Sequence, residues 1–118
     1  MEVHRYLRSP LPPALEHFWE IADGLRFNFD RLVFSTAEFI RENQRIRSLP
    51  DRMPFEGLYF IGSMGDGDQF AIGRTNEEEW NLSVLIWEHE TDRRYEVAES
   101  LTDYVARMIV WWSDNSHG

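Results

Sequence analysis

The sequence contains no cysteine and no lysine among its 118 residues. The absence of cysteine excludes a disulfide framework, a thiol nucleophile and a cysteine-built metal site. Long apolar runs are also missing, since none approaches the roughly 20 residues that a membrane-spanning helix needs. The first residues lack the charged and then apolar pattern of a signal peptide. We therefore expect a cytoplasmic protein without a membrane segment.

Complete catalytic motifs are missing as well. The segment Gly65–Phe70 begins like a dinucleotide-binding fingerprint, but phenylalanine stands at the third glycine position and a strand-like run follows. Ser63 follows Gly62 without the Gly-x-Ser-x-Gly spacing of a hydrolase nucleophile. The histidines are scattered and form no His-x-x-x-His pair. We therefore expect no catalysis, no cofactor and no bound metal.

The composition is that of a folded domain. Hydrophobic residues make up 42% of the chain and aromatic residues 14%, which is enough apolar surface for a core. A chain of 118 residues is long enough for one core and short for two. We therefore predict a single domain over residues 1–118.

Charge is distributed unevenly along the chain. Residues 1–50 hold seven arginines and seven acids, whereas residues 51–118 hold five arginines and 14 acids and so carry the whole net charge of −9. An acidic field repels phosphate backbones and attracts basic proteins. Direct nucleic-acid binding is therefore disfavoured and a basic protein partner is favoured. Simple solubility is the alternative explanation of the acidic character.

Three helices are indicated by end signals and apolar spacing. The first is predicted over Pro12–Gly24, where prolines suit the first turn and glycine the C-terminal cap. Its apolar stripe consists of Leu15, Phe18, Trp19 and Ala22. Ser35 and Glu38 form a capping box for a second helix that ends near Arg47. Ser100 caps a C-terminal helix with a wide apolar face, on which either Trp111 or Trp112 should be buried.

Apolar runs between turn residues predict the strands. The region Gly62–Asp68 is a Gly/Asp turn that closes a hairpin, and Asp30-Arg31 is the predicted turn of an earlier one. Thr75–Asn81 is predicted as an acidic loop. The expected strands are Leu25–Phe29, Leu32–Phe34, Leu58–Ile61, Gln69–Ile72, Val84–Trp87 and a last strand that turns into the C-terminal helix at Val97–Leu101. This order predicts an α+β fold, with a largely antiparallel or mixed sheet flanked by helices. Trp19 and Trp87 are predicted in the core.

Acidic clusters near the turns are the candidate functional residues. Glu88, Glu90 and Asp92 alternate, so they offer carboxylates on one face, as a glycosidase pair or a divalent-cation site requires. Solvated hairpin acids are the favoured interpretation. Trp80 follows three glutamates and is either an interface anchor with a charged rim or a cover for a sheet edge.

A set of short motifs occurs in a characteristic order from residue 11 to residue 112: Leu11-Pro12, Phe18-Trp19, Asp23-Gly24, Ile61-Gly62, Gly65–Asp68, Val84–Glu90 and Val97–Leu101. In this order they resemble the SUKH superfamily, in the branch similar to fungal cell-wall assembly regulators of the Smi/Knr type. The segment before Leu11 is shorter than the leading helix of many members.

The resemblance implies a bacterial immunity protein that binds a polymorphic or contact-dependent toxin, often a nuclease, in the cytoplasm. The expected partner is a basic toxin domain, and the expected state is a monomer or weak homodimer. The predicted toxin-binding residues are Asp66, Asp68, Glu77, Glu78, Glu79, Trp80, Glu88, Glu90 and Asp92. The main alternative is an intracellular regulatory or scaffold protein of the cell-wall type, and a small hydrolase using the acids near Glu88 is a third possibility.

Overall fold

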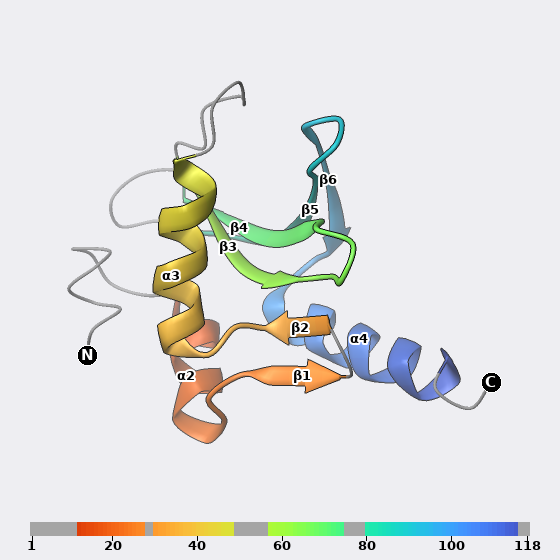
Figure 1. Ribbon diagram of the computed structural model, residues 1–118. Coiled ribbons are helices and arrows are strands. Elements are labelled where there is room, and N and C mark those ends of the chain that lie inside the picture. Colours follow the sequence, from red (N-terminus) through yellow and green to blue (C-terminus); the bar gives the residue numbers. More distant parts are fainter. Residues whose placement is uncertain (1–11, 28–29, 49–56, 75–79, 116–118) are drawn as a thin grey trace.

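The computed structural model describes residues 12–27, 30–48, 57–74 and 80–115. Two strands follow the first of these helices and four strands follow the second, before a C-terminal helix (Figure 1). In chain order they are α2 (Pro13–Ile21), β1 (Leu25–Phe27), β2 (Asp30–Val33), α3 (Thr36–Arg47), β3 (Leu58–Ser63), β4 (Gln69–Arg74), β5 (Trp80–Glu88), β6 (Arg93–Ala98) and α4 (Leu101–Asn115).

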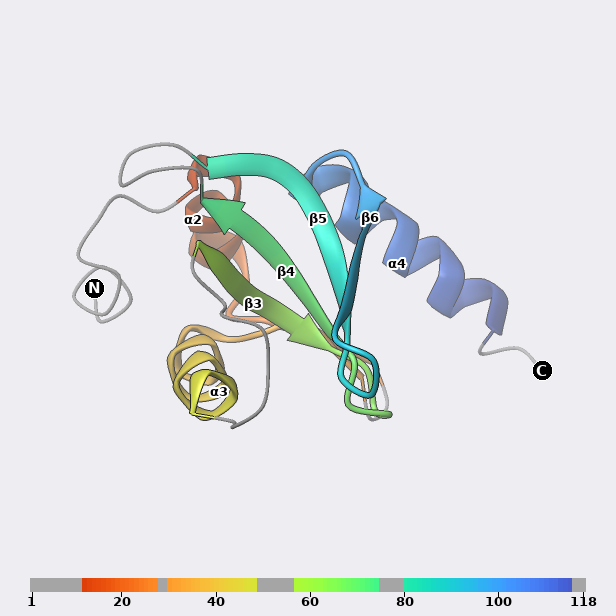
Figure 2. The same cartoon turned by 90° about the horizontal axis from the view of Figure 1, so that it is seen from above.

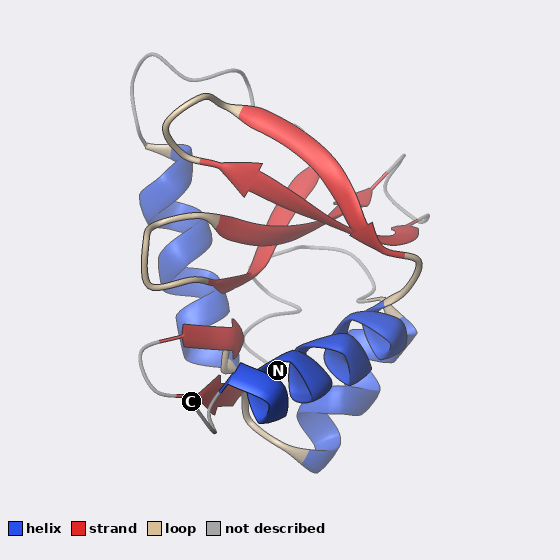
Figure 3. Ribbon diagram, turned by 90° about the vertical axis from the view of Figure 1, so that its right-hand side faces the viewer, coloured by secondary structure: helices blue, strands red, loops and turns tan. Residues whose placement is uncertain are grey.

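The six strands form one sheet in the order β1-β2-β3-β4-β5-β6, and every neighbouring pair is antiparallel. Helix α3 lies on one side of the β3–β6 part of the sheet and α4 on the other (Figure 2). Helices α2 and α4 contact each other (Figure 3). The predicted α+β class with a largely antiparallel sheet is therefore confirmed.

Helix α2 packs on the body of the protein through the buried Leu15 and Trp19. The Trp19 side chain is 7% exposed, and its Nε1 donates a hydrogen bond of 2.9 Å to the Phe34 carbonyl oxygen. Its ring meets Phe39 of α3 edge-on, with 5.4 Å between the ring centroids. A bulky residue with one polar atom thus satisfies a buried carbonyl while it fills the space between two helices.

Helix α3 is joined to β3 by a buried amide. The predicted capping box of Ser35 and Glu38 is present at its start. Farther along, the fully buried Asn43 donates from Nδ2 to the carbonyl oxygens of Phe39 and Phe60, at 2.8 Å each. Its Oδ1 accepts from the Phe60 N–H at 2.8 Å. The buried amide thus forms three hydrogen bonds to backbone atoms and ties α3 to β3 at Phe60.

Strands β2 and β3 approach each other unusually closely at Gly62. A Cβ at that position would lie 2.1 Å from the Leu32 carbonyl oxygen. Beside it, the Phe34 N–H donates to the Ile61 carbonyl oxygen at 2.6 Å. Glycine is therefore required here by the space between two backbones.

Helix α4 follows the end of β6 and packs through its first turns. Ser100 Oγ accepts from the Asp103 N–H at 3.0 Å, so the predicted cap is confirmed. Tyr104 is fully buried, and its hydroxyl donates a 2.6 Å hydrogen bond to the Leu32 carbonyl oxygen. Its ring lies 4.9 Å from that of Phe70. Burial, and to a lesser degree the charge of Asp30, raise the pKa of Tyr104 well above its ordinary value.

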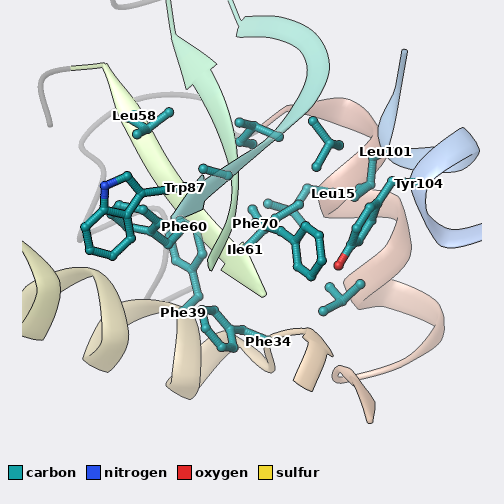
Figure 4. Close-up of a cluster of buried hydrophobic side chains, with 14 of the residues drawn as sticks. Leu15, Phe34, Phe39, Leu58, Phe60, Ile61, Phe70, Trp87, Leu101 and Tyr104 are labelled. Carbon is teal, nitrogen blue, oxygen red and sulfur yellow. The ribbon is translucent and has the colours of Figure 1, made fainter. Parts of the chain in front are cut away.

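The core lies between the sheet and the helices (Figure 4). Trp87 is 2% exposed, as predicted for a core residue. The largest fully buried side chains are Trp87, Tyr104, Phe34, Phe39, Phe60, Leu15, Leu32, Ile46, Ile61, Val33 and Val84. None of the helices in the described ranges is long and apolar enough to cross a membrane.

Three predicted boundaries were wrong. Helix α2 was expected to run to a glycine cap at Gly24, but it ends at Ile21 with Ala22 as its C-cap. Asp30 and Arg31 were expected in a turn, but they belong to β2 and pair with Phe27 and Arg26 of β1. They fit a strand because Arg31 reaches Glu38 on α3 at 3.1 Å and thereby gains a partner outside the sheet. Trp80 was expected in a loop but begins β5. Strand pairing with Arg74 extends the sheet to that residue.

The structure tests the expected burial of a tryptophan near the end of α4 for only one of the two residues. The side chain of Trp111 is 40% exposed, and that of Trp112 lies outside the described residues. The predicted helical spacing itself is present, because α4 runs from Leu101 to Asn115.

Candidate functional site

Two turns meet at one end of the sheet, and they carry four of the eight acidic residues predicted to bind a partner. The register pairs Gln69, the first residue of β4, with Trp87 near the end of β5. The β3–β4 turn and the β5–β6 turn therefore lie at the same end (Figure 2). We call the two turns together, residues 64–68 and 89–92, the hairpin tips.

The β3–β4 turn is held by its own backbone and by aspartate side chains. The Gly67 N–H donates to the Met64 carbonyl oxygen at 3.1 Å, and the Asp68 N–H donates to Asp66 Oδ1 at 3.0 Å. Gly67 has φ = 103°, a left-handed conformation that glycine adopts without strain. From the neighbouring β2, Asp30 Oδ1 accepts from the Gly65 N–H at 2.8 Å. The carboxylates are thereby presented on an ordered turn.

His89 connects the two turns. Asp68 Oδ1 lies 2.7 Å from the ring nitrogen Nδ1 of His89. The same oxygen accepts a hydrogen bond from the backbone N–H of His89 at 3.1 Å. The imidazole lies against Gly67, where a Cβ would come within 3.1 Å of His89 Cε1. A side chain at Gly67 would displace the ring, so the glycine serves both the turn and the contact between turns.

The hairpin tips enclose a small acidic hollow of about 130 Å³. Its lining residues are Asp66, Asp68, Glu88, His89, Glu90 and Thr91. Asp66 is exposed, and the Glu90 side chain is 83% exposed. The other two carboxylates lie deeper, with side-chain exposures of 19% for Asp68 and 30% for Glu88. Three carboxylates from the two turns and the Glu88 carboxylate at the end of β5 thus line one hollow.

Glu88 has an unused acceptor at this site. Its Oε1 is buried and accepts no hydrogen bond from any described residue, although Arg93 Nε lies 3.7 Å away. A buried carboxylate oxygen without a donor costs free energy, and an incoming donor relieves that cost. The described residues contain no group of three or more His, Asp or Glu side chains arranged to hold a metal ion. Glu88 Oε1 can therefore accept a hydrogen bond from a donor that enters the hollow.

Asp92 does not join these carboxylates. Its φ of 61° turns the chain, and its Oδ1 accepts a hydrogen bond from Trp87 Nε1 at 2.5 Å. Arg94 Nη2 lies 3.4 Å from the same oxygen. The alternation of Glu88, Glu90 and Asp92 in sequence thus does not place all three on one face, because strand geometry ends at Glu88.

Trp80 packs against the body of the protein. It is partly buried, and its ring lies 5.4 Å from that of Tyr59 in an edge-on contact. Tyr59 in turn stacks on Phe39 of α3 at 6.5 Å. This placement agrees with the predicted role as a cover for the sheet. Glu77, Glu78 and Glu79 lie outside the described residues.

Sequence reasoning missed the part that His89 plays. The sequence shows only a histidine between Glu88 and Glu90, and its partner Asp68 lies 21 residues earlier. The one available signal was that both turns are acidic and close neighbouring hairpins. A pairing across turns of this kind follows from strand register, which the spacing of apolar residues does not fix to the residue.

The fold and the site define a small α+β protein that brings four carboxylates together at one end of its sheet. The sequence matches the SMI1 / KNR4 family (SUKH-1) over residues 2–107, so the chain belongs to that family. Members of the SUKH type are often immunity proteins. Comparison with curated proteins and with solved structures gives no match.

Proposed function

We propose that this protein is an immunity protein that binds a cognate toxin domain through the hairpin tips and blocks it by occlusion, without catalysis or a cofactor. Family membership supports the general role. The observation that carries the proposal is the convergence of Asp66, Asp68, Glu88 and Glu90 on one hollow. The toxin is expected to be basic, and a nuclease fits this expectation because it must attract phosphate.

The carboxylates of the hollow can bind the cationic side chains with which a nuclease toxin would bind phosphate. Guanidinium and ammonium groups form short, charge-assisted hydrogen bonds with carboxylates. A toxin arginine that enters between the turns would meet the exposed Asp66 and Glu90 first and then the unused Oε1 of Glu88. The carboxylates would thereby take the place of the phosphates that the toxin normally binds.

The opposite charge on α3 would orient the encounter. Glu38 and Glu42 have side chains only 13% and 8% exposed, whereas Arg41 and Arg45, which pair with them, are 62% and 54% exposed. The outer surface of α3 is therefore basic in spite of the net charge of −9. A basic toxin is repelled from α3 and attracted to the tips, which speeds productive association.

The test is binding kinetics against the candidate toxin domain encoded beside this gene. The variant Asp66→Asn/Glu90→Gln removes two exposed charges without changing side-chain size. We expect roughly tenfold slower association at low salt, and a smaller difference as salt screens the charges. Glu99→Gln is the matched control, because Glu99 is an exposed acid beyond the opposite end of β6.

Two outcomes contradict the proposal in different ways. Tight binding that the double variant leaves unchanged would place the toxin-binding surface elsewhere. Absence of any complex with the wild-type protein, together with full toxin activity in its presence, would argue against immunity. Co-purification with cell-envelope proteins would then favour the regulatory or scaffold role.

A further inference from the structure

A second hollow, which shares no lining residue with the hairpin tips, lies between β1, the end of β2 and the first turns of α3 (Figure 1). Its volume is about 490 Å³, so it is larger than the hollow at the tips. Leu25 and Val33 give it an apolar part, and Arg26, Glu38 and Arg41 give it a charged part. We call it the β1–α3 hollow.

Three arginines converge on one carboxylate oxygen at this hollow. Glu38 Oε2 accepts hydrogen bonds from Arg26 Nη2 at 2.8 Å and from Arg31 Nη1 at 3.1 Å. Arg41 Nη2 lies 4.0 Å from the same oxygen, which is beyond hydrogen-bond distance. The Glu38 side chain is only 13% exposed, whereas those of Arg26 and Arg41 are 63% and 62% exposed. The carboxylate is therefore largely covered, and two arginine side chains remain accessible from solvent.

Positive charge is in excess around the hollow. Glu42, one turn farther along α3, lies 3.6 Å from Arg31 and 2.8 Å from Arg45, so four arginines share two glutamates among the described residues. Asp23 also lines the hollow, and its Oδ1 accepts a hydrogen bond from the Thr36 N–H at 3.0 Å. The arginines outnumber these three carboxylates, so a further anion would be attracted.

The lining of the hollow fits a carboxylate on a short aliphatic stem. Arg26 and Arg41 each lie within 4.0 Å of the same oxygen, so one incoming carboxylate can pair with both. A guanidinium group has five N–H donors, and Arg41 donates none of them to a described residue within hydrogen-bond distance. Leu25 and Val33 offer apolar contact to the methylene groups that carry the carboxylate.

The net charge of the chain selects against larger anions. A charge of −9 repels the continuous negative charge of a nucleic acid or of an anionic membrane surface. A second copy of the chain carries the same net charge and is repelled as well. A single carboxylate on an otherwise uncharged segment meets the local arginines without such a field, so a partner protein is the favoured source of the anion.

We infer that the β1–α3 hollow binds a glutamate side chain of a partner protein, with its carboxylate between Arg26 and Arg41 and its methylene groups against Leu25 and Val33. This surface goes beyond the proposed function, because the hairpin tips attract cations and this hollow attracts an anion. The contact joins exposed charges, so it weakens as salt rises.

The probe is the blocked peptide acetyl-Ala-Glu-Ala-amide, and the matched peptide carries glutamine in place of glutamate. Titration at low salt is followed by ¹⁵N NMR, which shows where the peptide binds. We expect the side-chain Nε–H signals of Arg26 and Arg41 to shift, and the glutamate peptide to bind at least about fivefold more tightly than the glutamine peptide.

Arg41→Gln and Arg26→Gln should each weaken binding of the glutamate peptide about fivefold. Arg41→Gln is the cleaner variant, because Arg41 lies beyond hydrogen-bond distance of Glu38. Arg107→Gln is the matched control, since Arg107 is 61% exposed and paired with Asp103 on α4, and its loss removes the same charge away from the hollow.

Several results would overturn the inference. They are an absence of shifts around the hollow, equal binding of the two peptides, and equal binding by wild type and Arg41→Gln, whose folding is checked by circular dichroism. Inorganic phosphate that shifts the same signals at lower concentration than the peptide would assign the hollow to a phosphate group. A wild-type dimer in light scattering that Arg41→Gln converts to a monomer would assign it to a second copy. Asp66→Asn/Glu90→Gln should not weaken peptide binding, which separates this inference from the proposed function.

Discussion

The hydroxyl group of Tyr104 joins α4 to β2 through one hydrogen bond, and its removal tests the packing of the fold. The side chain is fully buried and donates to the Leu32 carbonyl oxygen at 2.6 Å. Tyr104→Phe keeps the ring contact with Phe70 and leaves that carbonyl without this donor. An unsatisfied buried acceptor costs about 1–3 kcal/mol, so we expect that loss in the free energy of unfolding. Tyr104→Ala also creates a cavity and should cost about 3–5 kcal/mol.

The same residue predicts a specific alkaline behaviour. Burial raises the pKa of Tyr104 well above its ordinary value of 10.0. Below about pH 10 both the folded and the unfolded chain keep the phenolic proton. Above that pH the unfolded chain loses the proton while the folded chain retains it, so the free energy of unfolding falls by about 1.4 kcal/mol per pH unit from this group. Tyr104→Phe lacks this titrating group, so its free energy of unfolding should fall less steeply as the pH rises.

The assay is urea denaturation followed by tryptophan fluorescence, at neutral pH and at two pH values above about 10. The gap between wild type and Tyr104→Phe should be largest near neutral pH and should narrow as the pH rises. A gap below about 0.5 kcal/mol at neutral pH would refute the hydrogen bond to Leu32. Parallel alkaline curves for the two proteins would refute the raised pKa.

Three further substitutions test other contacts by urea denaturation. Gly62→Ala places a Cβ 2.1 Å from the Leu32 carbonyl oxygen and should cost about 3 kcal/mol or more, so wild-type stability would refute the close approach of β2 and β3. Asn43→Ala removes the side-chain hydrogen bonds to the N–H and C=O of Phe60 and should cost about 1–3 kcal/mol, and no measurable loss would contradict the role of this amide in joining α3 to β3. Burial alone would raise the pKa of Glu38, but hydrogen bonds to its carboxylate outweigh this effect and lower the pKa. The stability that Glu38 contributes is therefore present above its ordinary pKa of 4.5 and is lost as the pH falls through the lowered value. Glu38→Gln should therefore destabilise the protein at neutral pH and much less in acid, and an equal effect at both would contradict this.

Local signals in the sequence were sufficient for most of the elements. The capping box at Ser35 and the Ser100 cap each act over three or four residues, and both helices start where these signals stand. The Gly/Asp turn before Gln69 likewise lies between the two strands that it was predicted to join. Such signals are reliable because the atoms involved are close along the chain in any compact state.

The candidate site depends on contacts that no local signal contains. Asp68 meets His89 across two turns, and Asp92 turns inward because Trp87 Nε1 needs an acceptor. Trp80 was placed between two roles by sequence alone, and its position beside Tyr59 depends on strand register. Strand register and side-chain partners are set by the assembled sheet. The sequence could therefore list candidate acidic residues, but it could not tell the acids that bond within the fold from those that are exposed on the surface.

Charges on the hairpin tips act at a distance, so their removal should slow association and leave dissociation nearly unchanged. Contacts that are buried in a complex form only after docking, so their removal should mainly speed dissociation. Measuring both rate constants for Asp66→Asn/Glu90→Gln therefore separates steering by surface charge from direct contact with the partner. Slower association alone would mean that the net charge of −9 acts through these exposed carboxylates.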